Sequence, residues 1–230
     1  AALAASGCST IGSGVKAIQD NVVAPVAKAL APEPAASAAS APADSGPTFS
    51  PNLKLLRPAV VVTPAAQRAF DDALRLLRAG RTDEAERAFK ALAQSNPELG
   101  GPHANLGVIY RQAGKFDESV AALERAVEAS PDQPLYFNQL GISCRHAGQF
   151  AKAREAYERA LSLDANYAAA QLNLGILFDL YLRDSTRALA AYERYTELSG
   201  GKDATVAKWV TDLKNRKPAP GHAPAKKEQS

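Results

Sequence analysis

Residues 64–216 carry apolar residues at helical spacing, and this pattern returns every 34 residues. The clearest markers are three similar tripeptides, Asn105-Leu106-Gly107, Gln139-Leu140-Gly141 and Asn173-Leu174-Gly175. A fixed period of this length is typical of stacked supersecondary units, each of which buries its apolar face only against its neighbours. We therefore predict an all-α solenoid of antiparallel helix pairs rather than a single enclosed catalytic core.

The period divides the folded part of the chain into four units. Thr63 and Pro64 suit the cap and the first turn of an opening helix. Pro97 and Pro131 lie near the ends of two successive units. Counting back from these prolines places the repeats at 66–99, 100–133, 134–167 and 168–202.

Glycines and other small residues predict the turns and the close contacts within each pair. The first helices should end at Gly80, Gly114 and Gly148, each in the left-handed conformation. Asp83 and Asp117 then fall near the start of the second helices, as N-terminal caps or as partners of the helix dipole. Glycine inside a helix costs about 1 kcal/mol relative to alanine, so small residues in register indicate close packing. They are Ala73, Gly107, Gly141 and Gly175 in the first helices, and Ala85, Ser119, Ala153 and Ala188 in the second.

Residues 203–216 predict one further helix. Val206, Trp209, Val210 and Leu213 recur at i, i+3, i+4 and i+7, which places them on one apolar face. Such a face is suited to covering the open side of the last repeat. The alternative is that Trp209 anchors a partner protein.

The repeat resembles the tetratricopeptide repeat over about 137 of the 230 residues. The second unit carries the resemblance most fully, through Leu106-Gly107, Tyr110, Ser119, Leu123, Ala126 and Pro131. The resemblance implies a right-handed superhelical solenoid of about four units with a C-terminal capping helix. The sequence departs from the family pattern at three places. Asp72 stands where the family has an apolar residue, which predicts a partly exposed first helix. Cys144 stands where the family has an aromatic residue, and the fourth unit has one extra residue around Arg183.

Charge and chemistry give no sign of an enzyme, a metal site or a cofactor. The net charge is +3, and residues 203–230 account for all of it, which argues against a nucleic-acid-binding stripe on the folded part. Cys8 and Cys144 lack metal-ligand spacing, and phosphate-loop and hydrolase motifs are absent. Cys144 and His146 do not face each other on a helix, so a buried structural thiol is favoured over a nucleophile. No run of about 18 apolar residues occurs.

The start of the chain, Leu3-Ala4-Ala5-Ser6-Gly7-Cys8, resembles the end of a bacterial lipoprotein signal peptide. The resemblance implies that residues 1–8 contain a signal remnant and that Cys8 is the lipidated residue; the alternative is an Ala-rich terminus with an unrelated cysteine. We expect residues 9–63 to be a flexible, disordered N-terminal arm, because residues 31–47 are almost entirely Ala, Pro and Ser. Residues 217–230 are expected to be a basic disordered tail.

In the tetratricopeptide-repeat family the first helices line a concave groove that holds an extended peptide or a partner helix. Amides at 34-residue steps suit a peptide main chain, and a guanidinium matches an acidic side chain. Leu74 occupies one of the positions at which chaperone-type members place a carboxylate clamp, so that clamp is absent. The alternative is that these polar residues only solvate a surface. The expected groove residues are Phe70, Asn105, Arg111, Gln112, Asn138, Gln139, Arg145, His146, Asn173 and Asp179.

Together these observations predict a non-catalytic protein–protein interaction scaffold. The favoured form is a lipid-anchored envelope protein that faces the periplasm, with outer-membrane sorting indicated by Ser9 after Cys8. It resembles tetratricopeptide lipoproteins that assist pilus or secretion-apparatus assembly. The alternative is a soluble cytoplasmic adaptor or co-chaperone. The expected partners are a protein or peptide in the groove and a membrane at Cys8, with no nucleic acid, small-molecule substrate or cofactor.

Overall fold

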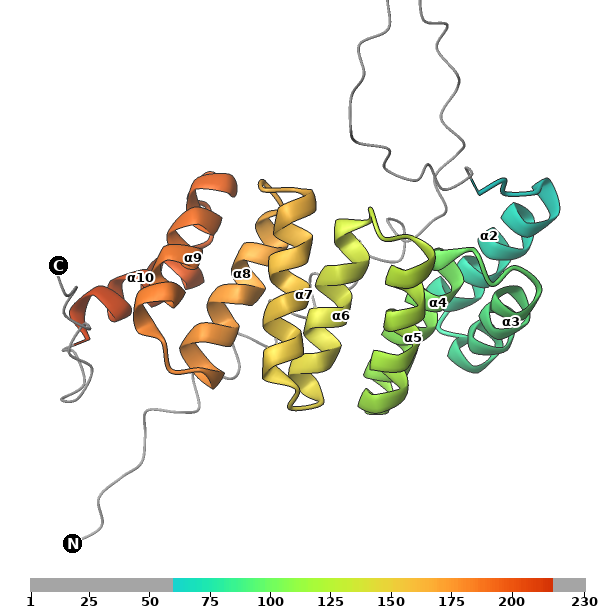
Figure 1. Ribbon diagram of the computed structural model, residues 1–230, viewed down its shortest axis with the longest axis horizontal. Helices are drawn as coiled ribbons and strands as arrows, with labels where there is room; N and C mark the ends of the chain where they lie inside the picture. Colours follow the sequence, from blue (N-terminus) through green and yellow to red (C-terminus); the bar gives the residue numbers. More distant parts are fainter. Residues whose placement is uncertain (1–59, 217–230) are drawn as a thin grey trace, which may run out of the picture.

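The computed structural model describes residues 60–216, which form a row of helices and no strand (Figure 1). The predicted all-α solenoid of helix pairs is confirmed. Cys8, the arm before Val60 and the basic tail lie outside the described residues, so the predictions made for them stay predictions. None of the helices within 60–216 is long and apolar enough to cross a bilayer. The elements are α2 Pro64–Arg78, α3 Thr82–Ser95, α4 Gly100–Gln112, α5 Phe116–Ala129, α6 Pro134–His146, α7 Phe150–Leu163, α8 Ala168–Ile176, η1 Leu177–Tyr181, α9 Ser185–Leu198 and α10 Ala204–Asn215.

Each repeat is a helix pair, and the pairs follow one another along the row (Figure 1). The first helices α2, α4, α6 and α8 pack against the second helices α3, α5, α7 and α9, respectively. The first helices α4, α6 and α8 also contact one another in sequence order, so they form a continuous layer. Every substantial contact between described helices therefore joins elements of the same repeat or of adjacent repeats.

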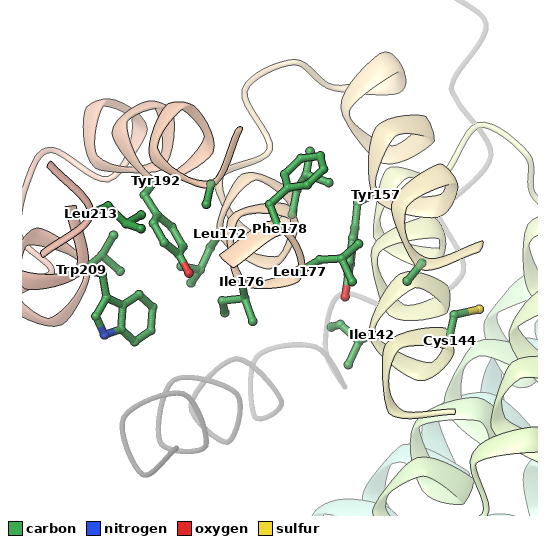
Figure 2. Packing of buried hydrophobic residues seen from close by; sticks show 14 of the residues in the cluster. Ile142, Cys144, Tyr157, Leu172, Ile176, Leu177, Phe178, Tyr192, Trp209 and Leu213 are labelled. Atoms are coloured by element: carbon green, nitrogen blue, oxygen red, sulfur yellow. The ribbon is translucent and has the colours of Figure 1, made fainter. Parts of the chain in front are cut away.

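Close approach of the two helices in a pair depends on a glycine that meets a large side chain. A Cβ atom on Gly107 would lie 2.5 Å from Leu123 Cγ, and one on Gly141 would lie 2.5 Å from Tyr157 Cε1. Gly175 has the same relation to the ring of Tyr192, also at 2.5 Å. Tyr157 and Tyr192 are completely or almost completely buried, and Figure 2 shows them inside the cluster formed by the third and fourth repeats. The glycines predicted as close-packing positions therefore have that role.

The predicted turns are confirmed, and of the two roles predicted for Asp83 and Asp117 the structure shows the second. Gly80, Gly114 and Gly148 have φ values of +74°, +73° and +75°. Asp83 and Asp117 lie in the first turns of α3 and α5, two residues after the cap positions Arg81 and Lys115. Their carboxylates therefore stabilise the positive end of the helix dipole instead.

The fourth repeat accommodates its extra residue at the end of its first helix. The α-helical pattern of α8 changes after Ile176 into the π-helical turn η1, which takes one more residue per turn. The left-handed position then falls on Arg183, with φ +57°, instead of on a glycine. Asp184 caps the next helix by accepting a hydrogen bond from the backbone N–H of Arg187 at 2.9 Å.

Helix α10 covers the last repeat, as predicted. Val206, Trp209 and Leu213 are buried, and the Trp209 ring packs against Tyr192 with ring centroids 5.4 Å apart. Asp203 caps the helix by accepting hydrogen bonds from the backbone N–H groups of Thr205 and Val206. Trp209 therefore belongs to the core rather than to an exposed anchor.

Substitution of Gly141 by alanine tests the glycine contact. The added methyl group would overlap the Tyr157 ring, so we expect a loss of about 1–3 kcal/mol in the free energy of unfolding. This loss should appear although alanine is the better helix former by about 1 kcal/mol. Denaturant unfolding of Gly141→Ala, Tyr157→Ala and the double variant gives the coupling. The cost in the double variant should be well below the sum of the two single costs, and additive costs would contradict the contact.

Candidate binding face of the first helices

The first helices carry equivalent residues at i, i+4, i+7 and i+8, a spacing that places them on one side of each helix. We call this side the inner face. In α4 it consists of Ala104, Val108, Arg111 and Gln112; in α6 of Asn138, Ile142, Arg145 and His146; in α8 and η1 of Leu172, Ile176 and Asp179. In α2 the matching residues are Phe70 and Leu74.

The centre of the inner face is apolar and buried. Ala104, Val108 and Ile142 belong to the core clusters of the second and third repeats. In Figure 2 Ile142, Ile176 and Trp209 lie along one side of the cluster, opposite Phe178. Phe70, predicted as a groove residue, packs edge-on against Phe89 with ring centroids 5.5 Å apart, and so contributes to the core of the first repeat.

The predicted amide ladder is present, but its side chains are engaged within the protein. The Asn105 side chain donates to the Gly101 carbonyl at 2.9 Å, and its Oδ1 has no donor among the described residues. The Asn173 side chain donates to Asn138 Oδ1 at 3.0 Å, and so joins the third and fourth repeats. The Asn138 amide group lies 3.5 Å from the Tyr167 hydroxyl. The Asn138 and Asn173 amides therefore link helices, whereas Asn105 bonds only within α4 and keeps one buried acceptor without a donor among the described residues.

Arg111 is the polar centre of the contact between α4 and α6. Its Nη2 donates to Gln139 Oε1 at 2.7 Å, and its Nη1 donates to Ser143 Oγ at 3.1 Å. Ser119 Oγ donates to the Gly107 carbonyl at 2.6 Å and lies 2.7 Å from Ser143 Oγ. Because the Ser119 proton is already used, Ser143 is the donor between the two hydroxyls. A continuous chain of hydrogen bonds thus runs from α4 through α6 to α5.

The Arg111 guanidinium forms no ion pair with a carboxylate of residues 60–216. Burial lowers its pKa to about 10; the Tyr157 hydroxyl opposes this shift, and the positive charge of Arg145 adds to it. Arginine remains charged at neutral pH with such a pKa. The inner face therefore holds a fixed positive charge in a poorly hydrated environment, where an opposite charge would be strongly attracted.

The remaining polar residues of the inner face differ in their surroundings. Arg145 is buried, with its guanidinium near the hydroxyls of Tyr157 and Tyr181 at 3.5 and 3.3 Å. Asp179 accepts a hydrogen bond from Arg216 at 3.0 Å, which ties η1 to the end of α10. Gln112 is exposed, and His146 is exposed along part of its surface.

The His146 ring stacks on Phe116, with centroids 5.3 Å apart and planes 18° apart. Loss of hydration on the packed side, together with the positive charges of Arg145 and Arg111, lowers the pKa of His146 to about 4. The imidazole is therefore neutral at physiological pH and adds no third positive charge to the face. The part of the chain that the structure describes contains no group of three or more His, Cys, Asp or Glu residues placed to hold a metal ion. Cys144 is buried, as predicted for a structural thiol.

Sequence comparison supports the repeat assignment directly. The tetratricopeptide-repeat family matches residues 98–166, and a second description of the same repeat matches residues 138–203. Residues 98–203 therefore match the tetratricopeptide repeat. A search of curated protein sequences finds no match to this chain.

Several solved structures share the fold at low identity. A crystal structure of the MamA protein is 21% identical, with a TM-score of 0.59 over 65% of this chain and 81% of that chain. MamA from Desulfovibrio magneticus RS-1 is 17% identical, with a TM-score of 0.60 over 68% and 87% of the two chains. PilF of Pseudomonas aeruginosa is 18% identical, with a TM-score of 0.59 over 65% and 67%. At these identities the likeness establishes the fold and leaves the partner of the repeats open.

Sequence reasoning missed the hydroxyl bridge between the second and third tetratricopeptide repeats. Ser119 was expected only as a small residue, and Ser143 was not singled out. The available signal was chemical: Ser119 occupies a position that is alanine in the other repeats, at Ala85, Ala153 and Ala188. A hydroxyl at a core position needs a hydrogen-bond partner, which predicts a second polar residue close by.

Replacing Arg111 by methionine tests whether this residue joins the repeats. The variant keeps much of the apolar bulk but leaves Ser143 Oγ and Gln139 Oε1 without their donor, so we expect the free energy of unfolding to fall by about 1–3 kcal/mol. Arg68 is exposed on α2, and Arg68→Met is the matched control, expected to change stability by less than about 0.5 kcal/mol. Urea unfolding of both variants makes the comparison, and equal losses would remove Arg111 from this role.

The lowered pKa of His146 predicts a pH dependence of stability. In the unfolded chain the imidazole takes up a proton near pH 6.5, whereas in the folded chain it does so near pH 4. The unfolded state therefore binds more protons between these values, and stability falls as the pH drops from 6.5 to 4. Because the ring is partly exposed, we expect a contribution of about 1 kcal/mol or less.

Histidine NMR titration and unfolding at pH 7 and pH 5 check this effect, with His146→Gln as the comparison. The variant should lose less stability between these pH values than the wild type. A His146 resonance that titrates near pH 6.5 in the folded protein would contradict the assignment.

Proposed function

We propose that this protein is a non-catalytic protein–protein interaction scaffold that docks a partner segment on its inner face. The observation that carries the proposal is the continuous layer of first helices, which repeats equivalent side chains at 34-residue steps. A solenoid of this kind offers an extended surface rather than a closed active-site cavity. The proposal assigns no catalytic step to any residue.

The chemistry of the inner face favours a particular kind of partner segment. Val108, Ile142 and Ile176 supply apolar contacts along three successive repeats. Arg111 supplies a positive charge whose hydrogen-bond partners are neutral oxygens of Gln139 and Ser143. An amphipathic helix or extended segment with an apolar stripe and one acidic side chain fits this pattern.

We further propose that the scaffold is held at a bacterial membrane by a lipid on Cys8 and faces the periplasm. The support is the sequence around Cys8, with small residues before it and Ser9 after it. The Ala-, Pro- and Ser-rich stretch of residues 31–47 would then lie between the anchor and the repeats along the chain. Assembly of an envelope machine such as a pilus or secretion apparatus belongs to this proposal as the context in which a tethered scaffold would act. A soluble cytoplasmic adaptor is the competing proposal.

One experiment in bacterial cells tests both parts of the proposal. A photo-crosslinking amino acid replaces Gln112, which is exposed on the inner face, or Glu158, which is exposed on second helix α7. Each is placed in the full-length precursor with Cys8 or with Cys8→Ala, and the cells are labelled with palmitate. We expect label and membrane association only with Cys8, and a discrete adduct with another protein only from position 112.

Each outcome has a separate meaning. Loss of the adduct at position 112, or equal adducts from both positions, would overturn the inner face as the docking surface. An unlabelled and soluble wild type would overturn the lipid anchor and favour the cytoplasmic adaptor. A labelled protein without an adduct would retain the anchor and reject the scaffold.

A further inference from the structure

The inner face is more deeply buried than the described helices explain. Ten consecutive residues of α4, Gly100–Ile109, are buried, so this helix is covered on all sides. On the inner face Ala104 and Ile176 are completely buried, and Leu172 is 4% exposed. Substantial contacts of α4 within residues 60–216 are made with α3, α5 and α6, and no described helix lies across several first helices. An additional element is needed over this face.

One segment before the described residues has the right chemistry for that position. Ile11, Val15, Ile18, Val22 and Val26 follow one another at steps of four, three, four and four residues. This spacing places them on one side of a helix, apart from the break that Pro25 imposes. The next stretch, residues 31–47, has no such apolar pattern.

We propose that residues 11–30 dock on the inner face of the same chain, with their apolar side chains over Val108, Ile142 and Ile176. The inference rests on the proposed function, because it uses the same face as the binding surface. It goes beyond that function by naming an occupant: the chain's own N-terminal segment covers the face, and a partner must displace it.

The connection is long enough for this arrangement. Residues 31–63 separate the segment from the start of α2, and 33 residues of flexible chain span roughly 30 Å on average. Successive packed helices lie about 8–10 Å apart, so three steps from α2 to α8 cover a similar distance. A helix of 14 residues is about 21 Å long, enough to cross two or three first helices.

The covalent connection favours the docked state. The tether keeps the segment at an effective concentration of the order of millimolar. A free partner can bind only while the face is open. Its apparent affinity therefore equals its intrinsic affinity multiplied by the fraction of molecules in which the face is open. The segment that follows the proposed lipid site would thus also regulate access to the repeats.

Photo-crosslinking within the purified full chain tests the inference without any partner. A benzophenone amino acid replaces Ile18, or Ala38 as the control in the Ala-rich stretch, and adducts are mapped by mass spectrometry at low protein concentration. We expect an intramolecular adduct from position 18 to peptides of α4, α6 or α8, and no defined adduct from position 38. Adducts to α5 or α7, adducts between two chains, or no adduct from position 18 would overturn the proposal.

A pair of variants gives a second readout. Ile18→Glu with Val22→Glu should detach the segment, expose the apolar inner face and raise the fluorescence of a bound naphthalene-sulfonate dye at least threefold. Ala35→Glu with Ala39→Glu adds the same charge at the same spacing and should leave the fluorescence at the wild-type level. Equal fluorescence in all three proteins would contradict the inference. A negative result here together with a cellular adduct at position 112 would retain the scaffold and reject only its self-occupation.

Discussion

The contact between a glycine of first helices α4, α6 and α8 and a large side chain of the paired second helix determines the rest of the architecture. At Gly107, Gly141 and Gly175 the partner side chain occupies the space where a Cβ would lie. This fixes both the distance between the two helices and their relative rotation. Once the rotation is set three times at 34-residue steps, the residues at i, i+4 and i+7 must fall on a common face. The inner face is therefore a consequence of core packing rather than a separately constructed site.

The repeats are equivalent in backbone but not in the interactions that join them. The second and third are connected by a hydrogen-bond chain through Arg111, Ser143 and Ser119, whereas the third and fourth are connected by the Asn173–Asn138 amide contact. Buried polar contacts of this kind stabilise only when nearly every member is satisfied, and they select one register over others. Apolar packing alone would tolerate more sliding between neighbouring repeats.

The sequence predicted features that depend on local chemistry. The left-handed glycines at 80, 114 and 148, the opening cap at Thr63 and the apolar face of α10 were all predictable, because each follows from a few adjacent residues. The roles of Arg111 and the amides were not, because they depend on which atoms of two different repeats meet. The extra residue was predicted near Arg183, but the π-helical turn η1 that accommodates it was not. The same sequence is compatible with a π-helical turn or with a longer loop, and packing against the neighbouring helices selects the π-helical turn.

The two ends of the described solenoid are closed in different ways. At one end, helix α10 buries Trp209 against the last repeat, and Arg216 joins it to Asp179. At the other end, the exposed residues of α2 include Arg68, Asp71, Asp72 and Arg75, so its outer surface is charged rather than apolar. A solenoid extends into a filament only if the last unit of one copy resembles the first unit of the next. Here neither end presents the surface of an internal repeat, so stacking copies of the described solenoid end to end would lack the contacts that join adjacent repeats.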